Sequence, residues 1–327
     1  TENTSPSTNQ AIAAGFTPDM AWIKGSTIGS GNPTAWGQYD TIRGDGMTLQ
    51  SDNNGAEGNY NTHPSGDLAM KFTSTGYNTP PLVNNNVNNA SDDYINYFWK
   101  AGGLASINTT GTITSIVSAN AAAGISVVKY IGNNTSGATI AHGLSSAPEM
   151  MIVKRLDSSG DWLVYNSNLG ATKYLIMNVD DAAYTASNVW NDTAPTSSVF
   201  SIGNYAEINT SGGSYIAYLF TSITGFSKAG SYVGNNPTAV SVSLGFNPDM
   251  VVIKNTTSSA DWVVYDKQRS PTGNFDDYLY LNTTGAQGTT GGNWVTPTAT
   301  GFTTNSAGGS LVNENGSTFI YLAFKQN

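Results

Sequence analysis

The residues best suited to acid–base chemistry in this sequence are three pairs of neighbouring aspartates, Asp92-Asp93, Asp180-Asp181 and Asp276-Asp277. A glycosidase needs two carboxyl groups on either side of one bond, roughly 5–10 Å apart. Neighbours on a strand point to opposite faces and do not supply that arrangement. The pairs also lack the Asp-x-Asp-x-Asp-Gly spacing of a calcium loop. We therefore interpret them as solvated turns and expect no catalytic residues, no metal site and no cofactor.

The two histidines, His63 and His142, are the other candidates for proton transfer. Serine is abundant, so a Ser-His-Asp arrangement stays open, but no Gly-x-Ser-x-Gly motif precedes a helix. A Tyr-Asp-x-x-Arg pattern at residues 39–43 and 265–269 can form a local ion pair on a turn. The corresponding residues 165–169 carry neither charge. We therefore interpret both the pattern and His142 as structural.

Aromatic residues within polar stretches indicate a different chemistry, the binding of sugars. Trp190 and Trp294 lie among Asn, Asp, Thr and Gly residues. A flat apolar ring face together with amide groups is what sugar-binding sites use. The same tryptophans could instead cap the end of a β-sandwich. The candidate glycan-binding or receptor-binding residues are Trp190, Asn191, Asp192, Trp294 and Tyr60.

A stretch that occurs three times must position these residues. It begins with Pro-Asp-Met or Pro-Glu-Met, runs as an apolar strand to a lysine, and is followed by a tryptophan and a Tyr-Asp or Tyr-Asn pair. Such self-similarity at a spacing of about one hundred residues indicates repeated domains of one design. The proline suits a strand entrance, where its missing N–H is harmless. The structural markers of the repeats are Pro18, Lys24 and Trp36, then Pro148, Lys154 and Trp162, then Pro248, Lys254 and Trp262.

The composition favours a neutral surface rich in hydrogen-bonding groups. Of the 327 residues, 39% are hydrophobic but only 11% are charged, and the net charge is −9. No basic stripe is present, so nucleic-acid binding through phosphate neutralisation is not expected. The absence of cysteine excludes disulfides and thiolate chemistry. No apolar run approaches the roughly 18–20 residues of a membrane helix, so no membrane insertion is expected.

Short apolar or alternating runs, separated by Gly, Asn, Asp and Pro clusters, predict an all-β fold. The Ala-rich patch at 119–124 is too short to form an independent helix. Roughly seven or eight short strands per hundred residues is typical of a β-sandwich. We therefore predict three tandem β-sandwich domains of jelly-roll or lectin-like type, each of about 100 residues. Their expected bounds are 1–103, 126–228 and 229–327.

Residues 104–125 interrupt this rhythm. The segment has no charged residue and almost no turn signal, and it is too apolar for a flexible tether. We predict that it is an ordered linker or a segment that pairs in an oligomer. Since an apolar, uncharged segment is an unusual surface for a monomer, we expect a homo-oligomer, with a trimer favoured.

The first repeat lacks the strand that begins the other two. A Tyr-Ile-Gly-Asn-Asn or Tyr-Val-Gly-Asn-Asn strand stands at 130–134 and at 232–236, whereas residues 1–9 contain no such sequence. We therefore expect that the gene product is longer or that earlier residues are not seen. A missing strand would bare one row of backbone groups. We expect a strand from another chain, or a loop, to cover that edge.

Several longer motifs are similar to those of one known group of proteins. They are residues 15–24, 97–103, 142–148, 169–174, 190–195 and 225–228. As a set they resemble a domain found in tandem in tail-fibre-like surface proteins of tailed bacteriophages and prophages. The resemblance covers almost the whole chain and is weakest over 104–125. It implies a virion surface protein, a fibre or a receptor-contacting part, and it brings no established active site.

These features together predict a structural and adhesive protein of the virion surface, and hence an extracellular one, that displays loops to a host-surface glycan or protein. Its expected partners are that receptor, other virion proteins and further copies of the chain. The main alternative is an enzyme, a tailspike-type depolymerase that cuts host polysaccharide. A third possibility is a subunit of a bacterial surface layer or filament. A depolymerase predicts converging carboxylates, whereas an adhesin predicts ring-stacking aromatics without them.

Overall fold

The computed structural model describes a chain built almost entirely of β-strands, and it confirms the all-β class. The helices among the described residues are single turns: α1 (Ser187–Trp190), α2 (Ala206–Asn209), α3 (Gly309–Val312) and the 3-10 turn η1 (Ser306–Gly308). None of these described helices has the length and apolar character needed to span a membrane. The structure describes residues 10–28, 34–59, 70–79, 87–88, 92–270, 274–290 and 293–326.

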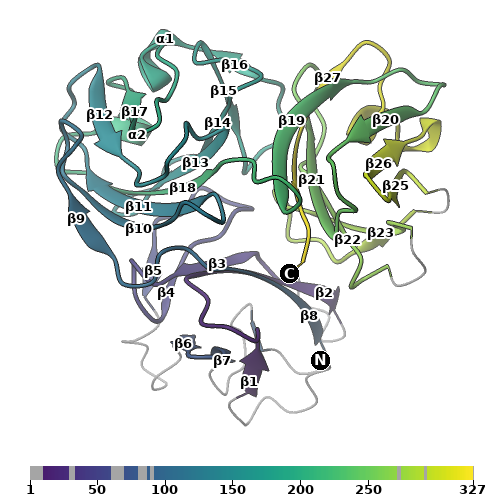
Figure 1. Cartoon of the computed structure of the whole chain (residues 1–327), viewed down its shortest axis with the longest axis horizontal. Helices are drawn as coiled ribbons and strands as arrows, with labels where there is room; N and C mark the ends of the chain where they lie inside the picture. Colours follow the sequence, from purple (N-terminus) through teal and green to yellow (C-terminus); the bar gives the residue numbers. More distant parts are fainter. Residues whose placement is uncertain are drawn as a thin grey trace.

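The same group of three antiparallel strands occurs once in each repeat (Figure 1). The strand after the marker proline lies in the middle, between the strand after the marker tryptophan and the last strand of the repeat. The groups are β3 (Gly37–Asp40), β2 (Met20–Ile28) and β8 (Asp92–Trp99); β14 (Leu163–Asn166), β13 (Met150–Arg155) and β18 (Ser214–Phe220); and β22 (Val263–Asp266), β21 (Met250–Asn255) and β27 (Thr318–Phe324). Their registers also agree, because each starting methionine lies opposite an aromatic residue: Met20 opposite Trp99, Met150 opposite Phe220 and Met250 opposite Phe324.

Alternation along the middle strands explains why they are apolar on nearly every residue. In β13, Met150 and Ile152 point to one side of the sheet, and Met151 and Val153 point to the other. The same division occurs in β2 and β21. Since successive side chains of a strand point to opposite faces, each middle strand is covered on both faces. One cover is a core of its own repeat, and the other is a central cluster to which all three repeats contribute.

Further strands widen the main sheets of the second and third repeats. The second repeat adds β11 (Ile125–Ile131), β15 (Lys173–Ile176) and β16 (Tyr184–Thr185), and the third adds β19 (Ser227–Val233), β23 (Asp277–Tyr280) and β24 (Gly288–Thr289). β11 and β19 begin these repeats and pair with the last strands, β18 and β27. No described strand pairs with β8 on the corresponding side. Residues 1–9, which lack the sequence of such a strand, lie outside the described residues.

A second set of strands belongs to each repeat and lines the core on its outer side. In the first repeat these strands are β1 (Gln10–Ala13), β7 (Gly76–Thr79) and β6 (Lys71–Thr73). In the second they are β12 (Ala138–Ala141) and β17 (Val199–Ile202), and in the third β20 (Val240–Ser243), β26 (Gly301–Thr304) and β25 (Val295–Thr298). The hairpin β4 (Met47–Thr48) with β5 (Gly58–Asn59) completes the described part of the first repeat. Core residues such as Ile140 and Phe200 come from this outer set.

The sequence predicts that residues 104–125 are an ordered linker or an oligomer-pairing segment. They form β9 (Ser106–Asn108) and β10 (Ser115–Asn120), which extend the sheet of the second repeat to eight strands through pairing of β10 with β11. Ile113 and Val117 are buried in the core of the second repeat. The apolar character of the segment is therefore explained in part within its own chain.

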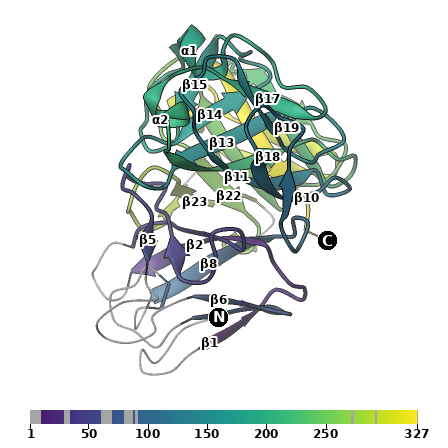
Figure 2. The same ribbon diagram turned by 90° about the vertical axis from the view of Figure 1, so that its left-hand side faces the viewer.

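The three repeats meet at a common centre. Figure 1 shows three lobes, and in the view of Figure 2 the first repeat lies below the other two. The central cluster contains residues of all three, including Trp22, Met150 and Met250. Because one face of each of the three main sheets packs on the same cluster, the repeats form a single packed body and not three independent domains.

Candidate functional site

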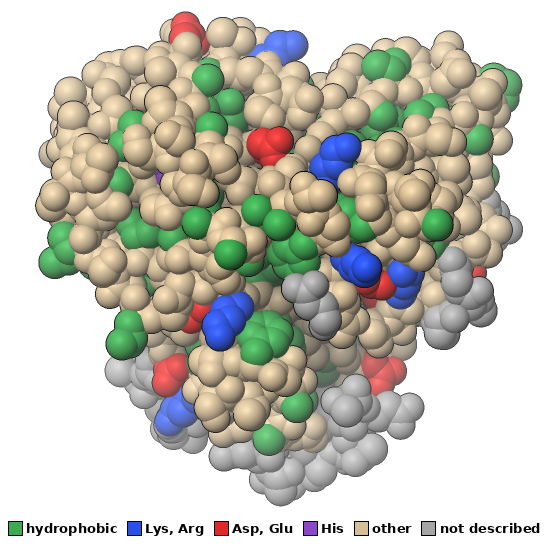
Figure 3. Space-filling model, in the orientation of Figure 1, with side chains coloured by type: hydrophobic (Ala, Val, Ile, Leu, Met, Phe, Trp, Pro, Cys, Tyr) green, Lys and Arg blue, Asp and Glu red, His purple; other side chains and the backbone are tan. Residues whose placement is uncertain are grey.

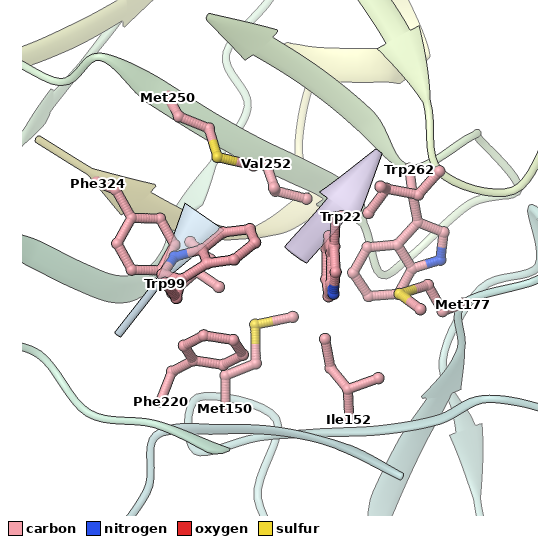
Figure 4. A pocket seen from close by; sticks show the side chains of 12 residues that line it. Trp22, Trp99, Met150, Ile152, Met177, Phe220, Met250, Val252, Trp262 and Phe324 are labelled. Carbon is pink, nitrogen blue, oxygen red and sulfur yellow. The ribbon is translucent and has the colours of Figure 1, made fainter. Parts of the chain in front are cut away.

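The centre of the molecule is the most distinctive site that the fold creates (Figure 4). Its side chains come from inward positions of the middle and last strands, from the marker Trp262, and from Met177 and Leu281, which directly follow β15 and β23. Trp22 lies edge-on to Trp99, with ring centroids 5.4 Å apart, and Trp99 lies edge-on to Phe324 at 5.7 Å. Phe220 of the second repeat also meets Phe324, at 5.9 Å. One aromatic chain therefore joins all three repeats.

The gap between these side chains is too small to be a ligand site. Its volume is about 10 Å³, and apolar residues line it. A cavity needs at least about 10–15 Å³ and several polar partners to hold one water molecule. The centre is therefore a packed core that joins the repeats.

The marker tryptophans close the ring of repeats through hydrogen bonds. The indole Nε1 of Trp36 donates to the carbonyl oxygen of Tyr280 in the third repeat, at 2.7 Å. Trp162 donates in the same way to Gln50 of the first repeat, at 2.9 Å, and Trp262 to Ile176 of the second, at 3.0 Å. Each repeat thus donates to its neighbour in one rotational sense. We call the three contacts the first–second, second–third and third–first seams.

The marker lysines follow the same cyclic pattern. Lys24, Lys154 and Lys254 are fully buried. Their ammonium groups donate to main-chain oxygens across the seams: Lys24 to Thr283 at 3.5 Å, Lys154 to Asn54 at 3.4 Å and Lys254 to Asp180 at 3.1 Å. Burial lowers the pKa of each lysine to about 8. Such a pKa would suit a nucleophile, but side chains that are fully buried and bonded to carbonyl groups cannot meet a substrate.

The Tyr-Asp-x-x-Arg pattern lies at two of the three seams. At the first–second seam, the Arg43 Nε is 2.5 Å from the Asp40 Oδ2, and the same oxygen accepts from the Tyr218 hydroxyl at 2.8 Å. Arg43 also donates to the main-chain oxygen of Gln38 at 2.7 Å. The pair is buried, and so is the tyrosine. The predicted local ion pair is therefore present, and it also binds the next repeat.

The third–first seam has the same triad. Arg269 Nε lies 2.6 Å from Asp266 Oδ2, and the Tyr97 hydroxyl donates to that oxygen at 2.6 Å. The second–third seam differs, since the corresponding sequence positions hold Asn166, Leu169 and Leu322. Asp, Arg and Tyr are thus replaced together, as expected when three side chains depend on one another. The Asn166 Nδ2 has no hydrogen-bond partner among the described residues.

His142, one of the two candidate histidines, makes main-chain contacts inside the second repeat. His142 is buried; its Nε2 lies 3.1 Å from the Thr196 carbonyl oxygen, and its Nδ1 accepts from the Leu144 N–H at 3.2 Å. Burial lowers the pKa of His142. His63 lies outside the described residues. The described residues contain no cluster of three or more His, Asp or Glu that could hold a metal ion.

The predicted sugar-binding residues do not converge on one site. Trp190 is only 1% exposed and packs edge-on against Tyr165, at 5.8 Å between ring centroids. Its prediction as a ligand-stacking residue is wrong, because the one-turn helix α1 directs the ring inward. Asn191 ends that helix in a left-handed conformation and accepts from the Ser136 hydroxyl at 2.8 Å, while Asp192 is exposed beside it.

Trp294 belongs to a separate aromatic group in the third repeat. It is partly exposed and stacks on Tyr278, with centroids 5.2 Å apart and planes at 22°. The ring centroid of Tyr280 lies 5.1 Å from that of Tyr278. On the neighbouring strand, Gly288 leaves room for the Tyr278 ring, because a Cβ at Gly288 would come within 2.4 Å of the tyrosine oxygen. Tyr60 lies outside the described residues.

The second repeat has an aromatic group that the sequence did not indicate. Tyr184, at the edge strand β16, is 37% exposed and stacks on Tyr174 at 5.3 Å and 20°. Tyr205 continues the row at 6.3 Å from Tyr174. The Tyr184 hydroxyl donates to the Asp181 Oδ2 at 2.5 Å. No local sequence pattern marks this group, because Tyr174 and Tyr184 come together only through the β15–β16 register.

Carboxylates lie close to this row. The Glu207 Oε2 accepts from the Asp161 N–H at 2.5 Å. Burial raises the pKa of Glu207, and the negative charge of Asp161 raises it further. The hydrogen bond to Asp181 raises the pKa of Tyr184. The arrangement offers a flat ring with acceptor oxygens beside it, which suits a hydroxyl-bearing ligand.

The comparisons with known proteins give a family without an assigned activity. A family model described as a domain of unknown function, DUF7483, matches residues 2–327. No curated protein and no solved structure matches the chain. This match spans all three repeats, so the chain belongs to the DUF7483 family.

Proposed function

We propose that the chain is a structural and adhesive component of a virion surface, such as a phage tail fibre or a head or tail appendage. In this role it displays loops outside the cell for attachment to a host-surface glycan or protein, alongside other virion proteins. The shared motifs with tail-fibre-like proteins support this location. The low charged fraction of 11% and the mostly uncharged polar surface in Figure 3 support contact with a neutral, hydroxyl-rich ligand.

We also infer that each repeat is a β-sandwich. In the second repeat, Ile140 and Phe200 of the β12–β17 pair pack with Met151 and Val153 of the main sheet. In the third, Val242 and Phe302 take the places of Ile140 and Phe200. Superposition of the three repeats in an experimental structure, with the marker tryptophans at equivalent positions, tests this inference.

One observation carries the non-catalytic part of the proposal. The three lysines with a lowered pKa and the two buried aspartate–arginine pairs make bonds between or within repeats. Lys154 is buried against carbonyl groups, and Asp40 with Arg43 is closed by Tyr218. A catalytic group must reach its substrate, and these groups are covered.

The ligand contact that we propose is the Tyr184 ring with its neighbouring carboxylates. Stacking on Tyr174 fixes the ring, so little conformational entropy is lost when a sugar packs against the exposed face. The Asp181 oxygen that accepts from the Tyr184 hydroxyl lies beside the ring. Trp294 with Tyr278 offers a second, independent ring surface in the third repeat.

Binding to an array of bacterial capsule and lipopolysaccharide glycans tests this function. We expect wild-type protein to bind a defined subset, and Tyr184→Ala to weaken that binding at least about tenfold, equivalent to 1.4 kcal/mol. Trp294→Ala reports on the second surface. Ile131→Ala is the matched control, since Ile131 is apolar, exposed and at the end of a different strand. Equal binding by all four proteins, or no binding to glycans or host cells, would contradict the proposal.

A depolymerase is the second candidate function, because Glu207 and Asp161 are neighbouring carboxylates and the pKa of Glu207 is raised. A glycosidase uses such a carboxylic acid as its proton donor. Release of reducing ends from host polysaccharide by wild-type protein, and its loss in Glu207→Gln, would establish the enzyme. We expect no release by either protein. A bacterial surface or filament subunit would instead be detected on cells that carry no phage particles.

A further inference from the structure

One end of the eight-stranded sheet is an uncharged strand, β9, whose sequence is Ser-Ile-Asn. Ile107, in the middle of β9, is 75% exposed, and Leu104 just before it is 99% exposed. No described strand pairs with β9 on its outer side. Natural edge strands are usually protected by charged residues, proline or a bulge. Residues 104–125 contain no charged residue and no proline.

Ile107 and Ile116 continue a face of the sheet that already contacts the other repeats. Ile107 lies opposite Ile116, Ile116 opposite Lys129, and Lys129 opposite Ile216. Directly opposed residues in a sheet point to the same face. Ile216 is buried in the central cluster that joins the repeats, whereas Ile116 remains 42% exposed. Along this row the side chains therefore change from buried, at Ile216, to solvent-exposed, at Ile116 and Ile107.

The alternation of hydrogen bonds decides which groups of β9 face outward. Thr221 N donates to the Gly124 oxygen, and Gly132 N to the Gly213 oxygen, each at 2.8 Å across the junction of β18 with β11. Antiparallel ladders alternate between bonded and non-bonded pairs. Carried across β11 and β10, this alternation bonds Ser106 and Asn108 to β10. The N–H and C=O of Ile107 then point away from the sheet.

We infer that the occupant of this edge is a second copy of the chain, which pairs its β9 antiparallel to the first about a two-fold axis at Ile107. The two Ile107 residues exchange both main-chain hydrogen bonds, and Ser106 of each copy faces Asn108 of the other. The apolar row then runs from Ile116 through both Ile107 residues to the second Ile116.

Charge favours this contact over other self-contacts. Two copies, each with a net charge of −9, repel one another, but the meeting strands carry no charge. An antiparallel pair of identical strands is self-complementary and closes at two copies. The trimer favoured from the sequence does not follow from this edge.

Disulfide cross-linking tests the geometry, and the chain has no cysteine of its own. A bonded antiparallel pair has Cα atoms about 5.5 Å apart, within the range that a disulfide spans. We expect Ile107→Cys to form a covalent dimer on mild oxidation. Val233→Cys is the matched control, because Val233 is 57% exposed and ends the unrelated strand β19. Equal cross-linking of the two variants overturns the inference.

Sedimentation tests the contact without a covalent bond. We expect the wild type to sediment as a dimer at roughly 100 μM and Ile107→Lys to dissociate at least about tenfold more readily. Val233→Lys should match the wild type. Far-ultraviolet circular dichroism should be unchanged, since both substituted side chains are exposed. A wild-type monomer at that concentration, or an oligomer that Ile107→Lys does not weaken, overturns the inference.

Discussion

At the scale of single residues, the three buried lysines show how an ionisable side chain can connect two repeats, by donating to carbonyl oxygens across a seam. Lys154 lies on the middle strand of the second repeat. Its ammonium group donates to the carbonyl oxygen of Arg155 in its own repeat, at 2.9 Å, and to that of Asn54 in the first repeat. A buried ammonium without such partners would cost several kcal/mol. A methionine of similar length could fill the space but could not satisfy the two oxygens.

Stability is expected to rise as the pH increases from about 8 to about 9.5. The folded lysines have a pKa of about 8 and the unfolded ones 10.5. Within that window the unfolded chain binds more protons, so deprotonation favours the folded state, by at most about 1.4 kcal/mol per pH unit for each lysine. Near pH 10 the effect is opposed, because burial raises the pKa of tyrosines such as Tyr218 above 10.0.

Urea unfolding at several pH values measures this slope. Lys154→Met should lose about one third of it, because two of the three equivalent lysines remain. The exposed Lys173 provides the control, and Lys173→Met should keep the wild-type slope. A slope that is flat, or the same in Lys154→Met and the wild type, would argue against titrating lysines at the seams.

The two triads give a second prediction at this scale. Asp40→Ala should destabilise the fold by about 3–5 kcal/mol, because it removes the nearer of the two carboxylates that pair with the buried Arg43 and leaves only Glu57 at 3.4 Å. Asn166→Ala, at the corresponding position of the second repeat, should cost only about 1 kcal/mol. Equilibrium unfolding in urea measures both values.

A paired substitution gives the control for the triads. Asp40→Asn with Arg43→Leu reproduces the Asn166 and Leu169 of the second repeat. It should cost less than Asp40→Asn alone, because the fully buried guanidinium is removed together with its nearest carboxylate. A double variant less stable than the single one would show that the charged pair is not the reason for the large cost.

At the scale of elements, the connection from β8 to β9 holds the β9–β10 pair in place. A Cβ on Gly102 would lie 2.4 Å from the carbonyl oxygen of Ala119 in β10. Gly102→Ala should therefore force the two segments apart and destabilise the fold by about 1–3 kcal/mol. Hydrogen exchange should also become faster in β10. Gly285→Ala is the control, as the nearest atom to its added Cβ would be at 3.6 Å. Unchanged exchange in β10 would contradict this account.

The strands could be predicted from the sequence because their signals are local. The proline, the apolar run and the lysine of each repeat lie within seven residues, as in residues 148–154. An apolar residue at nearly every position is typical of a strand covered on both faces. What covers the second face depends on distant segments, so the contact between Trp22 and the other repeats could not be predicted. Trp190 was misjudged because its polar neighbours indicated exposure, whereas α1 directs it inward.

At the scale of the whole molecule, the closed ring of seams predicts a single unfolding transition. The central cluster contains residues of every repeat, so no repeat can unfold without exposing apolar surface on the others. Trp22→Ala should lower the midpoint of that one transition and cost about 3–5 kcal/mol. Differential scanning calorimetry measures both effects.

The excised fragment 104–228 provides a complementary measurement. It would expose Met150, Ile152 and Phe220, which the other repeats cover in the whole chain. We expect this fragment to bind a hydrophobic dye and to aggregate. Three resolved transitions in the whole chain, or a fragment that is monomeric and does not bind the dye, would disprove the shared-core account.

The third–first seam also bears on how the chain is made. Trp36 finds its acceptor 244 residues later, at Tyr280, and Trp99 meets Phe324 near the end of the described chain. A ribosome adds about 5–20 residues per second, so the tryptophans of the first repeat wait for on the order of ten seconds or more before their partners emerge. Throughout that time the growing polypeptide carries an uncovered aromatic surface. The length of that exposure is therefore set by the speed of translation.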